Sequence, residues 1–171
     1  MIKKLYLAGP LGFSESGRDF LYGKLIPTIK KAGYDVINPW ELTPQKELQP
    51  IFDMHDGPKK IKALQGIDRT LGLRNEQGIL ISNGIVACLD GTDVDSGTAA
   101  ELGFGYAKGK RILGYRNDFR LASENLGVRV NIQVAYFINA SRGEIISNLS
   151  ELPLALKRVF NPPNMKKATK S

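Results

Sequence analysis

An uninterrupted apolar segment, Gly84 to Leu89, constrains the fold of this chain more than any other part of its sequence. The segment reads Gly-Ile-Val-Ala-Cys-Leu, so every position is apolar or small. A strand of this composition is typical of a parallel sheet that helices cover on both faces, because neither side of the strand can face water. The segment therefore predicts an α/β fold with a buried strand.

Shorter strand candidates alternate with stretches of helical spacing along the rest of the chain. The predicted strands are residues 5–8, 34–37, 84–89, 111–115 and 144–147, and the predicted helices are residues 18–31, 60–80, 98–108, 131–138 and 151–160. Pro27 is expected to kink or split the first helix. Residues 39–60 contain four prolines and are predicted to form a long, partly irregular excursion. The alternation predicts an open, mostly parallel five-stranded sheet flanked by helices.

Composition indicates a globular protein of one domain. The chain has 171 residues, of which 42% are hydrophobic and 24% charged, so a single domain over residues 1–160 can build a core of its own. Residues 161–171 contain three lysines and are predicted to be a basic, flexible tail. The single cysteine and the single histidine exclude a disulfide framework and a Cys/His zinc cluster.

Charge and hydropathy limit the partners that we expect. The formal net charge is +7, but basic and aromatic residues do not interleave as a nucleic-acid-binding surface requires. The amino terminus lacks the pattern of a signal peptide, and no apolar run approaches the roughly 18 residues of a membrane span. We therefore expect a cytoplasmic protein with no nucleic-acid or membrane partner.

Two loops are expected to meet at one edge of the sheet. Ligands of an open parallel sheet bind beyond the carboxyl ends of the strands, where the strand order reverses. The segment from Gly9 to Gly17 follows the first strand, and the segment from Asp90 to Gly97 follows the third. We therefore expect the substrate between these loops, with Gly9 close to it.

The second of these loops and the helix after it carry four carboxylates within twelve residues, namely Asp90, Asp93, Asp95 and Glu101. We expect Glu101 in the first turn of the helix, where the helix dipole favours an ionised carboxylate. Such a carboxylate can attack an acetal-like carbon while a second acid protonates the leaving group. The spacing Thr98-Ala-Ala-Glu101 also matches a capping box, in which Glu101 would only cap its own helix.

Two segments of the chain resemble the nucleoside 2-deoxyribosyltransferase family. They are Leu-Tyr-Leu-Ala-Gly-Pro-Leu-Gly-Phe at residues 5–13 and Asp-Gly-Thr-Asp-Val-Asp-Ser-Gly-Thr-Ala-Ala-Glu-Leu-Gly-Phe-Gly-Tyr-Ala at residues 90–107. With the order of elements, the resemblance covers roughly residues 2–160. It implies a flavodoxin-like domain that exchanges the base of a 2-deoxynucleoside for a free nucleobase. The reaction implied runs through a covalent deoxyribosyl-enzyme with retention of configuration, and it uses no cofactor or metal.

The resemblance also implies roles for particular residues. Glu101 corresponds to the nucleophile, and Tyr6 to the tyrosine whose hydroxyl orients that nucleophile. Asp95 corresponds to the acidic residue near the 5-hydroxyl of the sugar, and Phe13 to an aromatic residue that lines the pocket. Asn131 is similar to the asparagine that a neighbouring subunit lends to the sugar site, which implies a homo-oligomer.

The sequence departs from the family pattern at one position. Asn75 stands where the family usually has an aspartate that serves proton transfer to the base. An amide can hydrogen-bond a base but cannot protonate it. Either Asn75 only recognises the base, or Asp93, Asp95 or Asp68 supplies the proton.

Three functions are compatible with these residues: base exchange, hydrolysis of deoxynucleosides or their monophosphates, and non-catalytic nucleoside binding. Asp95 favours a free nucleoside, because its charge would repel a 5-phosphate. Glu101 weighs against a binding module, which needs no nucleophile. Trp40, after the second strand, either stacks on the base or packs at the rim. The choice between purines and pyrimidines, the tolerance of ribonucleosides and the number of subunits stay open.

Overall fold

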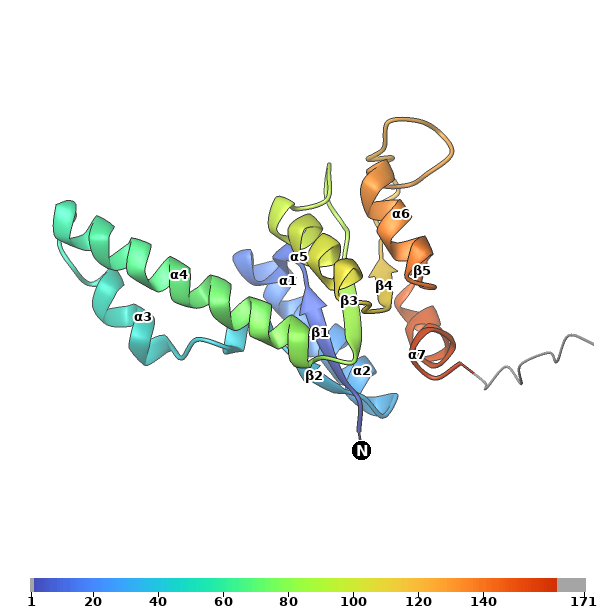
Figure 1. Ribbon diagram of the computed structural model, residues 1–171, viewed down its shortest axis with the longest axis horizontal. Coiled ribbons are helices and arrows are strands. Elements are labelled where there is room, and N and C mark those ends of the chain that lie inside the picture. The colour runs from blue at the N-terminus through green and yellow to red at the C-terminus, as the bar shows by residue number, and fades with distance from the viewer. Residues whose placement is uncertain (1, 163–171) are drawn as a thin grey trace, which may run out of the picture.

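A computed structural model describes residues 2–162, and its centre is a five-stranded parallel sheet in the order β2-β1-β3-β4-β5 (Figure 1). The strands are β1 (Lys4–Ala8), β2 (Asp35–Ile37), β3 (Gly84–Cys88), β4 (Ile112–Tyr115) and β5 (Glu144–Ile146), and every neighbouring pair is parallel. The predicted α/β fold is confirmed. Most of the predicted basic tail, from Pro163 onward, lies outside the described residues.

Helices cover both faces of the sheet. They are α1 (Glu15–Phe20), η2 (Leu21–Leu25), α2 (Ile26–Lys31), α3 (Gln45–Phe52), α4 (Pro58–Ile81), α5 (Ser96–Ala107), α6 (Ile132–Ala140) and α7 (Leu152–Phe160), with short 3-10 turns η1 (Pro10–Phe13), η3 (Pro39–Glu41) and η4 (Leu149–Glu151). Val86 of β3 packs in the apolar core on the side of η2, α2 and α7, whereas Ile85 packs on the side of α5 and α6. The apolar strand is therefore buried on both faces, as its sequence predicts.

Pro27 is accommodated without breaking the first helical segment. The segment runs from α1 through the π-helical turn η2 into α2, and Pro27 is the second residue of α2. Proline lacks an N–H and cannot make the usual bond to the fourth residue before it. The Ile26 N–H donates to Leu21 O, which is the wider spacing of a π turn. Pro27 is therefore associated with a local change of helix type.

The excursion predicted at residues 39–60 is partly irregular, as expected, but it contains a helix that the sequence did not predict. It includes η3, all of α3 and the start of α4, and residues 42–44 and 53–57 between these elements are not helical. Arg74 of α4 donates to Thr43 Oγ1 at 3.0 Å and to Glu47 Oε2 of α3 at 2.9 Å. Pro50 lies inside α3, and a proline at this place is the reason that the sequence did not predict the helix. Figure 1 shows the α3–α4 hairpin extending away from the sheet.

Among residues 2–162, none of the helices combines the length and the apolar character that crossing a bilayer requires.

Helix α5 approaches β3 closely because of one glycine. A Cβ added at Gly105 would lie 2.2 Å from Cδ1 of Ile85, which is fully buried, whereas a Cβ added at Gly103 would meet Phe137 at 3.4 Å. The absence of a side chain at Gly105 therefore sets the distance between the sheet and the helix that carries Glu101.

We predict opposite stability effects for these two glycines. Gly105→Ala is expected to lower the free energy of unfolding by about 1–3 kcal/mol, because the added methyl overpacks the core against Ile85. Gly103→Ala is the matched control in the same helix, and it is expected to be neutral or to stabilise by up to about 1 kcal/mol through helix propensity. Urea unfolding of both variants measures the difference. Equal effects would contradict the close approach of α5.

Candidate active site

A cavity of about 300 Å³ opens beyond the carboxyl ends of β1 and β3. The chain passes from β1 outward to β2 and then returns to β3 on the other side of β1, so the strand order reverses here. Open α/β sheets bind ligands at this point. The cavity is lined by Gly9, Phe13, Pro39, Trp40, Leu71, Asn75, Asp95, Gly97, Thr98 and Glu101. Larger hollows of about 520 and 540 Å³ lie elsewhere, but no carboxylate lines either of them.

A hydrogen bond between β1 and α5 holds Glu101, one of the residues that line the cavity. Tyr6 is fully buried, and its hydroxyl donates to Glu101 Oε1 at 2.6 Å. Burial raises the pKa of Glu101 to about 7; the hydrogen bond from Tyr6 opposes this rise, and the charge of Asp95 adds to it. Burial, and then the charge of Glu101, raise the pKa of Tyr6 far above its usual range. Tyr6 therefore stays a hydrogen-bond donor near neutral pH.

Asp95, not Glu101, caps helix α5. The Asp95 Oδ2 atom accepts from both the N–H and the hydroxyl of Thr98, each at 2.9 Å. Because the helix begins at Ser96, Glu101 lies in its second turn. The expectation that Glu101 lies in the first turn is therefore wrong, and so is the capping-box interpretation of its role. The Glu101 carboxylate instead faces Tyr6.

An aromatic pair forms the opposite wall. The rings of Phe13 and Trp40 meet edge to face, with centroids 4.6 Å apart and planes at 85°. Phe13 is 74% exposed and Trp40 is 37% exposed, so both can contact a ligand. The Asn38 side chain accepts from the Trp40 N–H at 3.3 Å and so fixes the η3 turn that carries the indole. A Cβ added at Gly12 would lie 2.1 Å from the Trp40 ring, so the ring packs directly on this backbone.

Six of the nine residues expected at the site line the cavity, Tyr6 contacts one of them from behind the lining, and two lie elsewhere. Gly9, Phe13, Trp40, Asn75, Asp95 and Glu101 all line the cavity. Asp93 is outside it, and its Oδ1 accepts from the Val94 N–H at 2.7 Å. Asn131 caps α6 by accepting from the N–H groups of Gln133 and Val134, and its amide donates to Glu124 at 2.7 Å. Neither side chain lines the cavity of its own chain.

Sequence reasoning missed Pro39, Leu71, Gly97 and Thr98. Leu71 lies one helical turn before Asn75, so helical periodicity could have identified it once Asn75 was placed at the site. Thr98 lies three residues after Asp95, and helix-capping preferences could have indicated their contact. Within residues 2–162, no three His, Cys, Asp or Glu side chains lie close enough together to hold a metal ion.

Comparison with known sequences identifies one family. The family model described as nucleoside 2-deoxyribosyltransferase matches residues 5–137 of this chain. An uncharacterized protein of Schizosaccharomyces pombe is 30% identical over 126 residues. That match covers 71% of this chain and 54% of the yeast protein, so the chain spans about half the length of this curated relative.

Solved structures share the fold. A conserved protein from Enterococcus faecalis V583 matches with a TM-score of 0.66 and 23% identity, over 92% of this chain and 99% of that one. The 2-desoxiribosyltransferase from Leishmania mexicana matches with a TM-score of 0.54 and 20% identity, over 80% and 97% of the two chains. The CMP N-glycosidase of Clostridium botulinum has a TM-score of 0.51 and 16% identity, over 91% and 98%. At these identities the likeness establishes the fold.

We predict that Glu101→Gln stabilises the fold in a pH-dependent way. Because the pKa of Glu101 rises from 4.5 to about 7 on folding, the native state binds more protons than the unfolded state between these values. The contribution of Glu101 to stability therefore falls as the pH rises through this window. Glutamine does not ionise, so the Glu101→Gln variant does not lose this stability. Its free energy of unfolding should exceed that of the native chain by nearly zero at pH 4.5 and by on the order of 3 kcal/mol above pH 7.

Urea unfolding between pH 4.5 and 8.5 measures this advantage. Glu76→Gln is the control, since it removes one exposed carboxylate of α4 outside the cavity. A pH-independent difference between Glu101→Gln and the native chain would contradict the burial of this carboxylate.

Proposed function

The chain belongs to the nucleoside 2-deoxyribosyltransferase family, and from this premise we propose that it transfers a 2-deoxyribosyl group between nucleobases at the cavity between β1 and β3. The observation that carries the proposal is the half-buried Glu101 carboxylate, which accepts a hydrogen bond from the Tyr6 hydroxyl and lines the cavity. Burial leaves this carboxylate poorly solvated. Forming a neutral ester with a sugar carbon removes its charge, so the same desolvation favours nucleophilic attack.

The proposed reaction is a double displacement. In the first step a Glu101 oxygen bonds to the anomeric carbon, and the carbon–nitrogen bond breaks with its electron pair going to the base. In the second step a nitrogen of another base bonds to that carbon, and the ester carbon–oxygen bond breaks to release the carboxylate. The incoming base loses a proton and the departing base gains one, so no proton is consumed overall. Two inversions give net retention. A 2-deoxy sugar favours this route because it lacks the electron-withdrawing 2-hydroxyl, so positive charge develops more easily at the anomeric carbon.

We assign the sugar and the base to opposite sides of the cavity. Asp95 uses Oδ2 to cap α5 and can offer its other oxygen to the 5-hydroxyl. Its charge would repel a 5-phosphate, so the proposed substrate is a free nucleoside. Phe13 and Trp40 provide flat apolar surface for a base, and the Asn75 amide can donate to it and accept from it.

We also propose a homo-oligomer in which Asn131 reaches the cavity of a neighbouring subunit. Ile132 and Tyr136 of α6 are 49% and 56% exposed, which gives the helix that follows Asn131 apolar surface for a contact. In the single chain the Asn131 amide donates to Glu124, so the neighbour would have to replace this contact.

Hydrolysis is the second candidate function. The fold is shared with a CMP N-glycosidase, and an open cavity admits water as well as a second base. The first displacement would be unchanged, and water would then release the sugar from Glu101. The negative charge of Asp95 distinguishes this cavity from one suited to a nucleoside monophosphate.

An exchange assay tests the transferase proposal. The chain is incubated with a 2-deoxynucleoside and a second free base, and formation of the new nucleoside is followed. Glu101→Ala is expected to lower the exchange rate on the order of 10³-fold or more, because the attacking group is lost. In the native chain, acid quenching during turnover should leave a deoxyribosyl mass on the peptide that contains residue 101.

Glu76→Gln is again the control and should keep full activity. Near-normal exchange by Glu101→Ala would refute the assignment of the nucleophile. Free base without any new nucleoside, even with acceptor base in excess, would establish hydrolysis instead.

The pH dependence of the reaction tests the role of Asn75. In the native chain kcat/KM should rise with pH through about 7, because Glu101 must be ionised to attack. The residues that line the cavity include no carboxylate besides Asp95 and Glu101, so Asn75 would bind the base without protonating it. Asn75→Asp is expected to add a falling alkaline limb and to speed the release of poor leaving bases. Asn75→Leu, which adds no acid, is the control. An unchanged profile in Asn75→Asp would place the proton donor elsewhere.

A further inference from the structure

Arg116 is a fully buried cation at the carboxyl end of β4. Its exposure is 0%, and it follows Tyr115, the last residue of the strand. In the described part of the chain, no carboxylate lies within 4.0 Å of its nitrogens as an ion-pair partner. Burying an arginine costs free energy unless its N–H groups are satisfied. The contacts that satisfy it therefore indicate what the residue does.

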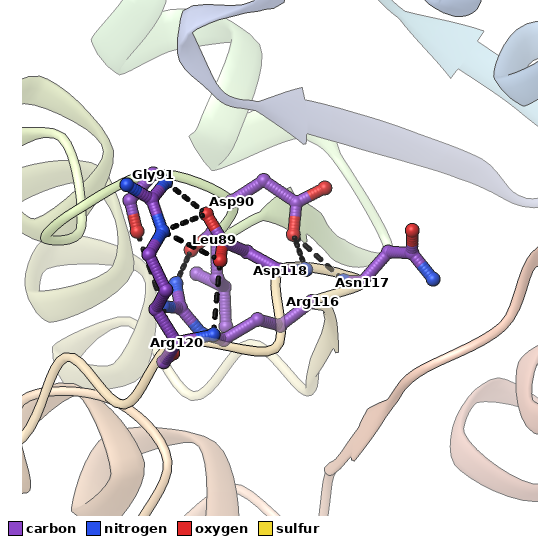
Figure 2. Close-up of polar contacts among 7 residues, drawn as sticks. All are labelled: Leu89, Asp90, Gly91, Arg116, Asn117, Asp118 and Arg120. Atoms are coloured by element: carbon purple, nitrogen blue, oxygen red, sulfur yellow. Dashed lines mark hydrogen bonds and ion pairs between the residues drawn. The ribbon is translucent and has the colours of Figure 1, made fainter.

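The guanidinium of Arg116 binds the backbone of the loop that enters the active site. Figure 2 shows the side chain reaching from β4 toward the end of β3. Its Nη1 donates to Leu89 O, and its Nη2 donates to Gly91 O at 3.1 Å and to Arg120 O at 2.7 Å. The Nε atom is buried without a partner. Arg116 thus holds the carbonyls of Leu89 and Gly91, at the start of the segment from Asp90 to Gly97, which we call the acidic loop.

Asp90 makes the reciprocal contact. Its Oδ1 accepts from the Asn117 N–H at 2.6 Å and from the Asp118 N–H at 2.8 Å, both in the segment that follows β4 (Figure 2). The segment after β4 therefore donates from Arg116 to the backbone of the segment after β3, and Asp90 of the segment after β3 accepts from the backbone of the segment after β4. We name these contacts of Arg116 and Asp90 the loop clasp.

The clasp determines where the acidic loop starts, and the loop determines where Asp95 lies. Gly91 has a φ of 136°, a conformation that side-chain-bearing residues rarely adopt, and its carbonyl is one of those held by Arg116. From there the chain reaches Val94, which is 8% exposed in the core, and then Asp95 at the start of α5. Only three residues separate Gly91 from Asp95, so a displacement of the Gly91 backbone would be passed on to Asp95.

We infer that Arg116 is a positioning residue: through the loop clasp it holds Asp95 where its carboxylate meets the 5-hydroxyl of the sugar. Arg116 does not line the cavity, so it acts through the backbone of Leu89 and Gly91. This inference rests on the proposed function for the identity of the ligand. The mechanical part, that the clasp orders the loop, stands without it.

The first test measures the order of the loop. Arg116→Lys keeps the charge but cannot reach three carbonyls at once, because lysine lacks the planar fork of arginine. Hydrogen exchange of the amides of residues 93–98 is expected to be at least about tenfold faster in this variant. Arg111→Lys is the matched control: Arg111, beside the other end of β4, donates to the Val159 carbonyl at 2.7 Å. Unchanged exchange at residues 93–98 in Arg116→Lys would overturn the inference, whatever the activity.

The second test separates positioning from a general structural role. KM and kcat are measured with a 2-deoxynucleoside and with its analogue that lacks the 5-hydroxyl. Arg116→Lys is expected to raise KM about tenfold for the first substrate and less than twofold for the second, with kcat changed little, since one hydrogen bond is lost. Equal changes for both substrates would overturn the inference.

Asp90→Ala provides a second variant in case Arg116→Lys does not fold. It removes the reciprocal half of the clasp without disturbing the buried cation, and it should give the same 5-hydroxyl-dependent rise in KM. A uniform effect of Asp90→Ala on both substrates would overturn the inference. If the native chain acts on neither nucleoside, the proposed function fails, and the exchange measurement alone decides whether the clasp orders the loop.

Discussion

The hydrogen bond from Tyr6 to Glu101 is the contact on which the rest of the site depends. It joins β1 to α5 across 95 positions of sequence, inside the sheet–helix interface. Tyr6 is fully buried, so its hydroxyl needs a partner, and Glu101 is the group that satisfies it. The fold therefore gives the Glu101 carboxylate one fixed hydrogen-bond donor, Tyr6. The carboxylate can still offer its other lone pairs to a ligand in the cavity. A packing requirement and a chemical requirement are met by the same bond.

The burial of Glu101 beside Tyr6 makes the site costly for the fold, although the hydrogen bond itself reduces that cost. Glu101 is removed from water far enough that its pKa rises to about 7, so an ionised Glu101 destabilises the native state. A protein selected only for stability would place an apolar residue at position 101. A half-buried carboxylate that lines a cavity is therefore better explained by chemistry than by packing.

The sequence could predict the parallel sheet because a strand that is apolar on both faces is typical of a parallel sheet covered by helices on both sides. Strand β3 lies in such a sheet. The acidic motif likewise located the cavity. The role of Glu101 within its helix could not be read from spacing, since a capping box and an Asp95 cap fit the same residues and only the fold decides between them. The contact between Tyr6 and Glu101 came from family resemblance; no local pattern indicates it. Helix α3 was not predicted, because Pro50 in its interior argues against a helix. Contacts with α4, such as that between Arg74 and Glu47, support the helix nevertheless.

Two different parts of the fold form the two sides of the cavity. Asp95 caps α5 and Glu101 lies within it; this helix packs on the sheet, and the loop clasp holds the backbone of the loop that leads into it. Trp40 and Asn75 come from η3 and from α4, whose hairpin with α3 extends beyond the sheet. The side formed at α5 carries the groups proposed for sugar chemistry, and the peripheral side, formed by η3 and α4, carries those proposed for base recognition. Substitutions on the peripheral side can alter which base is accepted with little effect on the nucleophile. Asn75, where the family resemblance leads us to expect an aspartate, lies on that side, away from the sheet core.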